Sequence, residues 1–360
     1  MTWEKGISAY TGLGYTVEDN RDYLHISRKY GYSRLFTSLH IPEADQQAVV
    51  QEFLYLTAYA KRLGFQVTAD ISPKAFSLLE IAPDDTVALL SLGIDTVRLD
   101  FGFTPEEIAA FTQKSDITVE INASSIDRKN LEKIIAAGAD VSRLRACHNF
   151  YPRPETGLSY DLFAERSSML RDFGITVTAF IPSRHNPRGP IFAGLPTLEQ
   201  HRHANPVIAA KHLLISGLVD GISFGDPHAP ESELAAVAAL DAKCFELEVE
   251  FVPDISQVER SILLARHTNR TDPGEHVIRS QEARTLCRGN VPARGALDRP
   301  RGAVTIDNAG YLRYMGELQI VCRSLPSDER VNVVAQIVPQ ELFLLDYIRP
   351  GCLFRFKEAR

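Results

Sequence analysis

Short β-branched runs alternate with helical segments along the first two thirds of the chain. Eight runs predict strands, because each is rich in Val, Ile, Thr or Phe and is bounded by turn residues. Thr16 with Asp19, and Thr104 with Pro105 and Glu107, predict helix N-termini, since they form capping boxes. The expected strands cover residues 6–10, 33–38, 66–71, 96–101, 118–122, 142–148, 176–181 and 221–225. Helix C-termini are expected at Gly31, Gly64, Gly93 and Gly138.

Eight strand–helix repeats predict an α/β fold, a (β/α)8 TIM barrel whose active site lies at the C-terminal ends of the strands. An open doubly wound sheet is the alternative. That fold would be expected to show a glycine fingerprint after its first strand, but Gly12 and Gly14 are followed by Val17 at the third position. We therefore interpret the two glycines as part of an ordinary loop.

The pattern changes near residue 242, which predicts a barrel domain over 1–242 and an all-β domain over 243–360. The second part alternates or is β-branched, with turns rich in Pro, Gly and Asp between the runs. Residues 268–301 are rich in Arg, Gly and Pro and are expected to form long loops. The expected strands of this domain cover residues 246–252, 302–306, 311–321, 331–338 and 353–356.

Polar residues recur at every second position of three barrel strands, and this spacing predicts that they face the lumen. Four carboxylates are the catalytic candidates, because several acids in a partly desolvated site separate into an acid and a base. They are Asp70, Asp100, Glu120 and Asp226, with Asn122 beside them. Two alternatives stay open. The carboxylates pair with Arg98, Arg143 or Arg145 inside the barrel, or they bind a divalent ion with His148, although no metal-ligand spacing supports a metal.

Two loops carry further candidate chemistry. The run HNFYPRPETGLS after the sixth strand offers side chains that hydrogen-bond hydroxyls, stack on a ring or bind an anion, unless its prolines only stiffen the loop. The loop over residues 182–206 is long enough to be a binding loop, and it stands where phosphate sites are common in barrels. The substrate-binding candidates are His148, Asn149, Tyr151, Arg153, Glu155, Arg184 and Arg188, and Arg279 in the second domain. For Arg279 the alternative of a solvated loop residue stays open.

Composition excludes several classes of function. The 360 residues carry a formal net charge of −7, which disfavours a nucleic-acid partner. No stretch approaches the length of a membrane span, and the N-terminus lacks an apolar targeting segment, so we expect a cytoplasmic protein with no membrane partner. The five cysteines are widely spaced without any CxxC, which predicts reduced thiols.

At HNFYPRPETGLS the sequence resembles the two-domain 6-phospho-N-acetylmuramidases, and the resemblance extends over nearly the whole chain. Ser183 departs from it, since relatives are expected to have glycine there. The other matching runs are TADISP (68–73), RLDFGF (98–103), EINAS (120–124), AFIPS (179–183), RGPIFAGLPTLEQHR (188–202) and FGDP (224–227).

The resemblance implies a TIM barrel followed by a small cyclophilin-like β-barrel. It also implies hydrolysis of the β-1,4 bond between 6-phospho-N-acetylmuramic acid and N-acetylglucosamine in peptidoglycan recycling, without a cofactor. Such a substrate has a phosphate and a lactyl carboxylate, which suits arginines in an acidic protein. Glycosidases use one carboxyl group as acid and a second as base, nucleophile or orienting group. The sequence leaves the oligomeric state open.

Two rival functions are compatible with a barrel followed by a β-domain. A pyridoxal-phosphate racemase needs a lysine on the first strand, and GISAY has none, since Lys5 precedes the expected strand. The other rival is a non-catalytic phosphosugar-binding protein, in which the carboxylates only hydrogen-bond hydroxyls. Turnover distinguishes it from a hydrolase.

Overall fold

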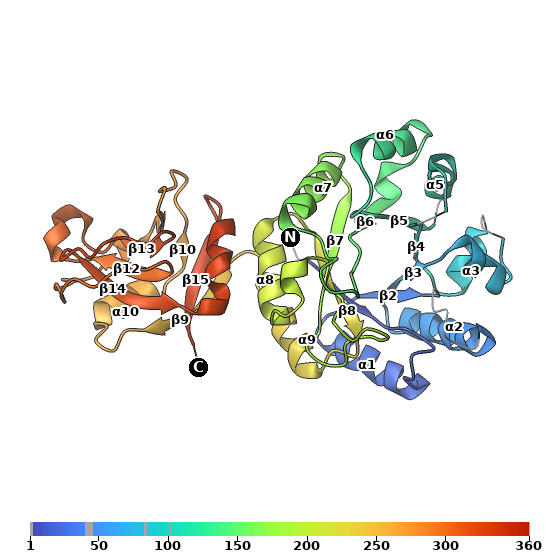
Figure 1. Ribbon diagram of the computed structural model, residues 1–360, viewed down its shortest axis with the longest axis horizontal. Coiled ribbons are helices and arrows are strands. Elements are labelled where there is room, and N and C mark those ends of the chain that lie inside the picture. Colours follow the sequence, from blue (N-terminus) through green and yellow to red (C-terminus); the bar gives the residue numbers. More distant parts are fainter. Residues whose placement is uncertain (1–2, 40–45, 83–84, 101, 115, 360) are drawn as a thin grey trace. The chain divides into compact units, whose positions relative to one another are not determined.

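A computed structural model describes residues 3–39, 46–82, 85–100, 102–114 and 116–359 of the chain. The chain divides into two compact units, Met1–Ala239 and Leu240–Arg360. Each unit has its own sheet and its own buried core (Figure 1). The two units are described separately below.

The first unit is a closed barrel of eight parallel strands in sequence order, which confirms the predicted fold (Figure 1). Seven of the strands lie within two residues of their predicted starts and ends. β4 ends at Arg98, earlier than expected, so Asp100 follows the strand, and Phe101 lies outside the described residues. The strands are β1 (Glu4–Ser8), β2 (Arg34–Ser38), β3 (Gln66–Asp70), β4 (Thr96–Arg98), β5 (Thr118–Asn122), β6 (Leu144–Cys147), β7 (Thr176–Ile181) and β8 (Gly221–Pro227).

Helices follow the strands and surround the barrel (Figure 1). Both predicted capping boxes are present, at Thr16 and Thr104. Gly93 shows why glycine follows a helix here: its φ is +84°, and a Cβ would lie 2.8 Å from the carbonyl oxygen of Thr57. The α-helices are α1 (Val17–Lys29), α2 (Gln46–Arg62), α3 (Pro73–Leu78), α4 (Thr86–Ser91), α5 (Pro105–Thr112), α6 (Arg128–Ala136), α7 (Tyr160–Asp172), α8 (Pro206–Ser216) and α9 (Glu231–Ala238), and the 3-10 helices are η1 (Val141–Arg143) and η2 (Glu199–His201).

The first strand differs in one detail from the prediction. β1 begins at Glu4 and therefore contains Lys5, which was expected to precede the strand. The Lys5 ammonium donates a hydrogen bond to the carbonyl oxygen of Ala238, the last residue of α9, so it is engaged on the helix side of the sheet. Gly12 and Gly14 lie in the β1–α1 loop with positive φ, as expected for an ordinary loop.

Alternation along the strands separates the two faces of the barrel wall. The apolar residues that alternate with the polar ones along each strand are fully buried against the surrounding helices. The polar residues line the lumen, beside the residues that pair with them on the neighbouring strands. Thr68 and Glu120 both border a small cavity inside the barrel. The buried apolar partners are Val67, Ala69, Val97, Leu99, Val119 and Ile121.

The second unit is a nearly closed, mainly antiparallel seven-stranded sheet with strand order β10-β15-β9-β14-β12-β13-β11. Its helical segments are α10 (Gln257–Leu263), α11 (Ala283–Leu286), η3 (Ala309–Tyr314) and η4 (Pro339–Tyr347). The strands are β9 (Phe245–Phe251), β10 (His267–Thr268), β11 (Val277–Arg279), β12 (Ala303–Asp307), β13 (Leu318–Val321), β14 (Val331–Ile337) and β15 (Leu353–Glu358).

Two expectations for the second unit are wrong in part. Residues 311–321 were expected to form one strand, but η3 and a turn occupy their first half. Asn308 caps η3 by accepting from the Gly310 amide, and Leu312 and Gly316 have positive φ, which breaks an extended run. Residues 268–301 were expected to form loops only, but they contain β11 and α11, which are too short to give a sequence pattern.

Within the described residues, none of the helices is both long and apolar enough to cross a membrane.

Candidate active site

A chain of charged side chains fills the barrel lumen. Glu120 lies on β5 with its side chain 4% exposed, and both of its oxygens face arginines. Nη1 of Arg98 lies 3.3 Å from Oε1 of Glu120, and Nε of Arg145 lies 3.3 Å from Oε2. Oε2 of Glu4 lies 2.6 Å from Nη2 of Arg145 and 3.7 Å from Nε of Arg34. Glu120 is therefore the counter-ion of two buried arginines below the end of the barrel.

Arg98 connects this lumen to the C-terminal end of the barrel, which we call the mouth. Its Nη1 donates to the carbonyl oxygen of Cys147 at 3.0 Å, and its Nη2 donates to Oδ1 of Asn149 at 2.5 Å. Burial opposes the charge of Arg98, but the surrounding acidic groups, with Glu120, Asp100 and Asp70 among them, outweigh burial and raise its pKa. Arg98 stays a cation and holds Asn149 in place.

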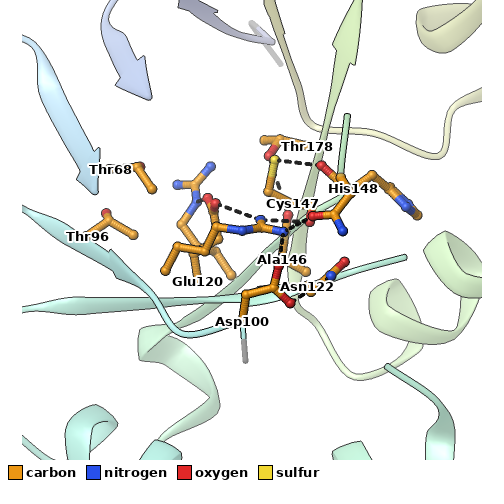
Figure 2. Close-up of polar contacts among 12 residues, drawn as sticks. Thr68, Thr96, Asp100, Glu120, Asn122, Ala146, Cys147, His148 and Thr178 are labelled. Atoms are coloured by element: carbon orange, nitrogen blue, oxygen red, sulfur yellow. Dashed lines mark hydrogen bonds and ion pairs between the residues drawn. The ribbon is translucent and has the colours of Figure 1, made fainter. Parts of the chain in front are cut away.

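Asp100 and Asp70 lie at the mouth, at the ends of the neighbouring strands β4 and β3. Oδ2 of Asp100 lies 3.5 Å from Nη2 of Arg98, and Oδ1 accepts a 2.8 Å hydrogen bond from Nδ2 of Asn122 (Figure 2). Asp70 ends β3 and is the register partner of Arg98. The side chain of Asp100 is 31% exposed and that of Asp70 is partly exposed, so both carboxylates lie where a ligand at the mouth can reach them.

Asp226 at the end of β8 organises the long β7–α8 loop. Its buried carboxylate accepts hydrogen bonds from the backbone amides of Ser183, Arg188 and Leu195, each at 3.0 Å. Burial raises its pKa, and the three amide hydrogen bonds offset part of that rise. Asp226 holds three points of one loop, so it positions residues of that loop.

Arg188 is the loop residue that this arrangement places over the mouth. Its guanidinium carbon lies 4.6 Å from the ring centroid of Tyr10 and 4.9 Å from that of Phe150. Tyr10 and Phe150 pack with Phe36 and Phe180 at the top of the lumen. A guanidinium that lies over two aromatic rings still has N–H groups that can bind an anion.

A second set of contacts connects the β6–α7 loop to the β7–α8 loop. Glu199 accepts from the amides of Glu155 and Gly157, and Arg202 donates to both of its oxygens at 2.6 Å. Arg202 also donates to the carbonyl oxygens of Tyr151 and Arg153. These contacts, chiefly the hydrogen bonds from Arg202, lower the pKa of Glu199 to about 2. Glu199 and Arg202 were not among the predicted residues.

The remaining predicted residues take different positions. His148 is fully buried, and its ring nitrogens contact the hydroxyls of Ser124 and Ser167, while burial lowers its pKa to about 3. Tyr151 is half-buried, and burial raises its pKa. Arg153, Glu155 and Arg184 are exposed on the two loops, whereas Arg279 belongs to the second unit, where its Nε lies 2.7 Å from Oε1 of Glu317.

Comparison with known proteins follows the same division of the chain. Residues 5–239 match the family described as 6-phospho-N-acetylmuramidase, N-terminal, and residues 245–357 match its C-terminal counterpart. The chain belongs to the 6-phospho-N-acetylmuramidase family. This membership confirms the resemblance found in the sequence, and the family's name describes a glycosidase.

Two solved structures resemble this family member over nearly its full length. An uncharacterized B. cereus protein is 35% identical with a TM-score of 0.89, covering 99% of this chain and 100% of that chain. A conserved Enterococcus faecalis protein of unknown function is 36% identical with a TM-score of 0.74, covering 99% and 96%. No curated protein matches the sequence.

Ser183, the departure from the family pattern, is engaged within the protein. Its hydroxyl donates to Oε2 of Glu233 at 2.7 Å, and the Arg184 amide donates to Oε1 of the same residue. Among the described residues, no group of three or more His, Cys, Asp or Glu side chains is placed to hold a metal ion.

Buried histidines predict a loss of stability in mild acid. Burial lowers the pKa of His148 to about 3 and that of His201 well below its usual range, whereas in the unfolded chain both titrate near 6.5. Below pH 6.5 the unfolded state therefore binds protons that the folded state does not. Each histidine lowers the free energy of unfolding by up to about 1.4 kcal/mol per pH unit as the pH falls.

Urea denaturation between pH 7.5 and 5.5 measures this slope. Asp307 in the second unit acts in the opposite direction, because burial raises its pKa to about 7, so the two units are best followed with separate probes. His148→Asn should reduce the pH dependence of the free energy of unfolding of the first unit. His203→Gln, at an exposed histidine, should leave it unchanged. An identical slope in both variants would contradict the assignment.

Proposed function

We propose that this protein hydrolyses the β-1,4 bond between 6-phospho-N-acetylmuramic acid and N-acetylglucosamine, as a cytoplasmic step of peptidoglycan recycling. The observation that carries the proposal is the pair of accessible carboxylates, Asp70 and Asp100, at the ends of the neighbouring strands β3 and β4, next to Arg98. Family membership supplies the substrate class. Two carboxyl groups at one site are what glycoside hydrolysis needs.

In this proposal the carboxylates of the barrel divide into two reacting groups and two positioning groups. Asp70 and Asp100 act on the glycosidic bond, one as the acid that protonates the leaving oxygen and the other as base, nucleophile or orienting group for the acetamide. Glu120 is fully engaged by Arg98 and Arg145 below them, and Asp226 is engaged by three backbone amides. These two therefore hold Arg98 and the Arg188 loop in position.

The polar groups around the carboxylates fit a phosphorylated amino sugar. Arg188 binds the phosphate, since its guanidinium lies over Tyr10 and Phe150 at the mouth and its N–H groups can reach an anion there. Asn122 and Asn149 orient hydroxyl or acetamide groups, and Tyr151 borders the same end of the barrel. Arg153 and Arg184, exposed on the two loops, lie within reach of the second anionic group.

An assay on two substrates tests the proposal. The purified protein should release N-acetylglucosamine from the 6-phosphorylated disaccharide far faster than from the unphosphorylated one. Arg188→Lys keeps the charge but loses the planar fork, so KM for the phosphorylated substrate should rise about tenfold. Arg143→Lys, in η1 before β6, is the matched control and should leave KM unchanged.

Each result has a defined meaning. Equal rates on both substrates would contradict a phosphate site. Tight binding of the phosphorylated disaccharide without any turnover would instead support a phosphosugar-binding protein. If Arg188→Lys retained the wild-type KM, the phosphate would be held elsewhere, and Arg184 or Arg153 would be examined next.

A further inference from the structure

A second cavity opens at the same end of the barrel as the mouth. Its volume is about 480 Å³, which is in the range of small-molecule sites. The residues around it come from the β7–α8, β8–α9 and β1–α1 connections, from the start of α9, and from α1 as far as Ile26. The three connections stand at the C-terminal ends of the strands, and the cavity extends from there along α1. Its lining includes Tyr15, Asp19, Asp22, Asn186, His228 and Glu231.

Three stacked rings form one wall of this cavity. The His228 ring lies between Tyr15, at 4.0 Å between centroids and 19° between planes, and Tyr23, at 4.8 Å and 26°. Tyr23 is buried, so the stack is supported from below, and Tyr15 is the partly exposed ring at its outer end. A partly exposed ring fixed by stacking provides a flat apolar surface for a ligand.

Most polar groups of the cavity are hydrogen-bond acceptors, although Asn186 and Tyr15 also offer a side-chain donor each. Nε2 of His228 lies 3.1 Å from Oδ1 of Asn20 and carries the proton, and because burial lowers the pKa of His228 to about 4, Nδ1 presents a lone pair at neutral pH. Oδ2 of Asp19 binds Thr16, and Oε1 of Glu231 binds Lys29 and Tyr30. Within the described residues, the other oxygens of Asp19 and Glu231, and the exposed carboxylate of Asp22, accept no side-chain hydrogen bond. A ligand here must therefore supply donors.

This cavity and the Arg188 side of the mouth differ in charge. Three carboxylates line the cavity and repel an anion, whereas Arg188 attracts one. Asp226 connects the two regions, because its carboxylate accepts from the Arg188 amide and His228 of the cavity follows it by two residues. The two regions are thus suited to the two different ends of one substrate.

We infer that this cavity binds the uncharged N-acetylglucosamine ring, with the sugar's apolar face on Tyr15 and its hydroxyl groups donating to the carboxylates and to His228. The inference rests on the proposed function and deepens it, since it assigns the non-phosphorylated half of the substrate. An acceptor-lined site next to an arginine-lined site orients the disaccharide in one direction. It also disfavours a second acidic sugar at this position.

Ligand-detected NMR with N-acetylglucosamine and the full chain tests the inference without requiring hydrolysis. We expect saturable binding that Tyr15→Ala weakens about three- to tenfold, as the loss of one ring contact predicts. Asp22→Asn should weaken it to a smaller extent. The matched controls are Tyr55→Ala, an exposed tyrosine on α2, and Glu132→Gln on α6, and neither should change binding.

The outcomes separate this inference from the proposed function. If binding depends on Tyr15 while the phosphorylated disaccharide is not hydrolysed, the cavity assignment stands and the proposed function fails. If hydrolysis occurs but Tyr15→Ala alters neither N-acetylglucosamine binding nor KM, the cavity assignment is overturned. Tighter binding of glucosamine, whose charged amine also supplies donors, would overturn it in favour of a cation site.

Discussion

Replacing Asp70 or Asp100 by asparagine is expected to lower kcat by about 100- to 10,000-fold, with the fold intact, because each substitution removes an acid–base group. Asparagine has nearly the same shape and can still contact Arg98, but it neither transfers a proton nor carries a negative charge. Both positions are partly exposed at the mouth, so neither change opens a buried cavity. Steady-state kinetics and thermal unfolding of each variant measure the two effects separately.

A substrate with an activated leaving group identifies which carboxylate is the acid. A good leaving group needs no protonation, so the acid variant should lose far less activity on an activated aryl glycoside than on the disaccharide. The other variant should lose activity on both. Asp172→Asn is the control, since Asp172 lies at the end of α7 remote from the mouth with its side chain 71% exposed. If both aspartate variants kept rates within a few-fold of wild type, the assignment of the site to the mouth would be wrong.

Alternation in the sequence predicted the face of each barrel residue but not its depth. Asp70, Arg98 and Glu120 all face the lumen side, as the period of two requires. Their heights along the barrel axis depend on the stagger between strands, which no single strand encodes. Asp100 follows the end of β4 and reaches the mouth, whereas Glu120 stands within β5 and meets two arginines.

Contacts between distant loops could not be read from the sequence at all. Glu199 and Arg202 are three residues apart and resemble an ordinary surface ion pair. Their partners, the amide of Gly157 and the carbonyl oxygens of Tyr151 and Arg153, belong to another βα connection. The parallel pairing of β6 with β7 brings the loops that follow these strands together.

Glu120→Gln is expected to affect stability more than chemistry. The substitution leaves Arg98 and Arg145 without a shared counter-ion in the lumen, where their side chains are 2% and 9% exposed. Removing one partner of a buried ion pair costs about 3–5 kcal/mol. Arg145 keeps its contact with Glu4 and Arg98 keeps its contact with Asp100, so we expect a loss at the lower end of that range. The free energy of unfolding in urea should fall by that amount. Arg128→Gln, which breaks the exposed pair with Asp172, should change it by less than about 1 kcal/mol.

Activity of the folded fraction completes the test of Glu120. Arg98 keeps its hydrogen bonds to the carbonyl oxygen of Cys147 and to Asn149, so the mouth retains most of its geometry at low temperature. The kcat of Glu120→Gln measured there should therefore fall much less than that of Asp100→Asn. A Glu120→Gln variant as stable as wild type but as inactive as Asp100→Asn would reverse the conclusion. Glu120 would then be a reacting group, and the substrate would have to reach below the mouth into the lumen.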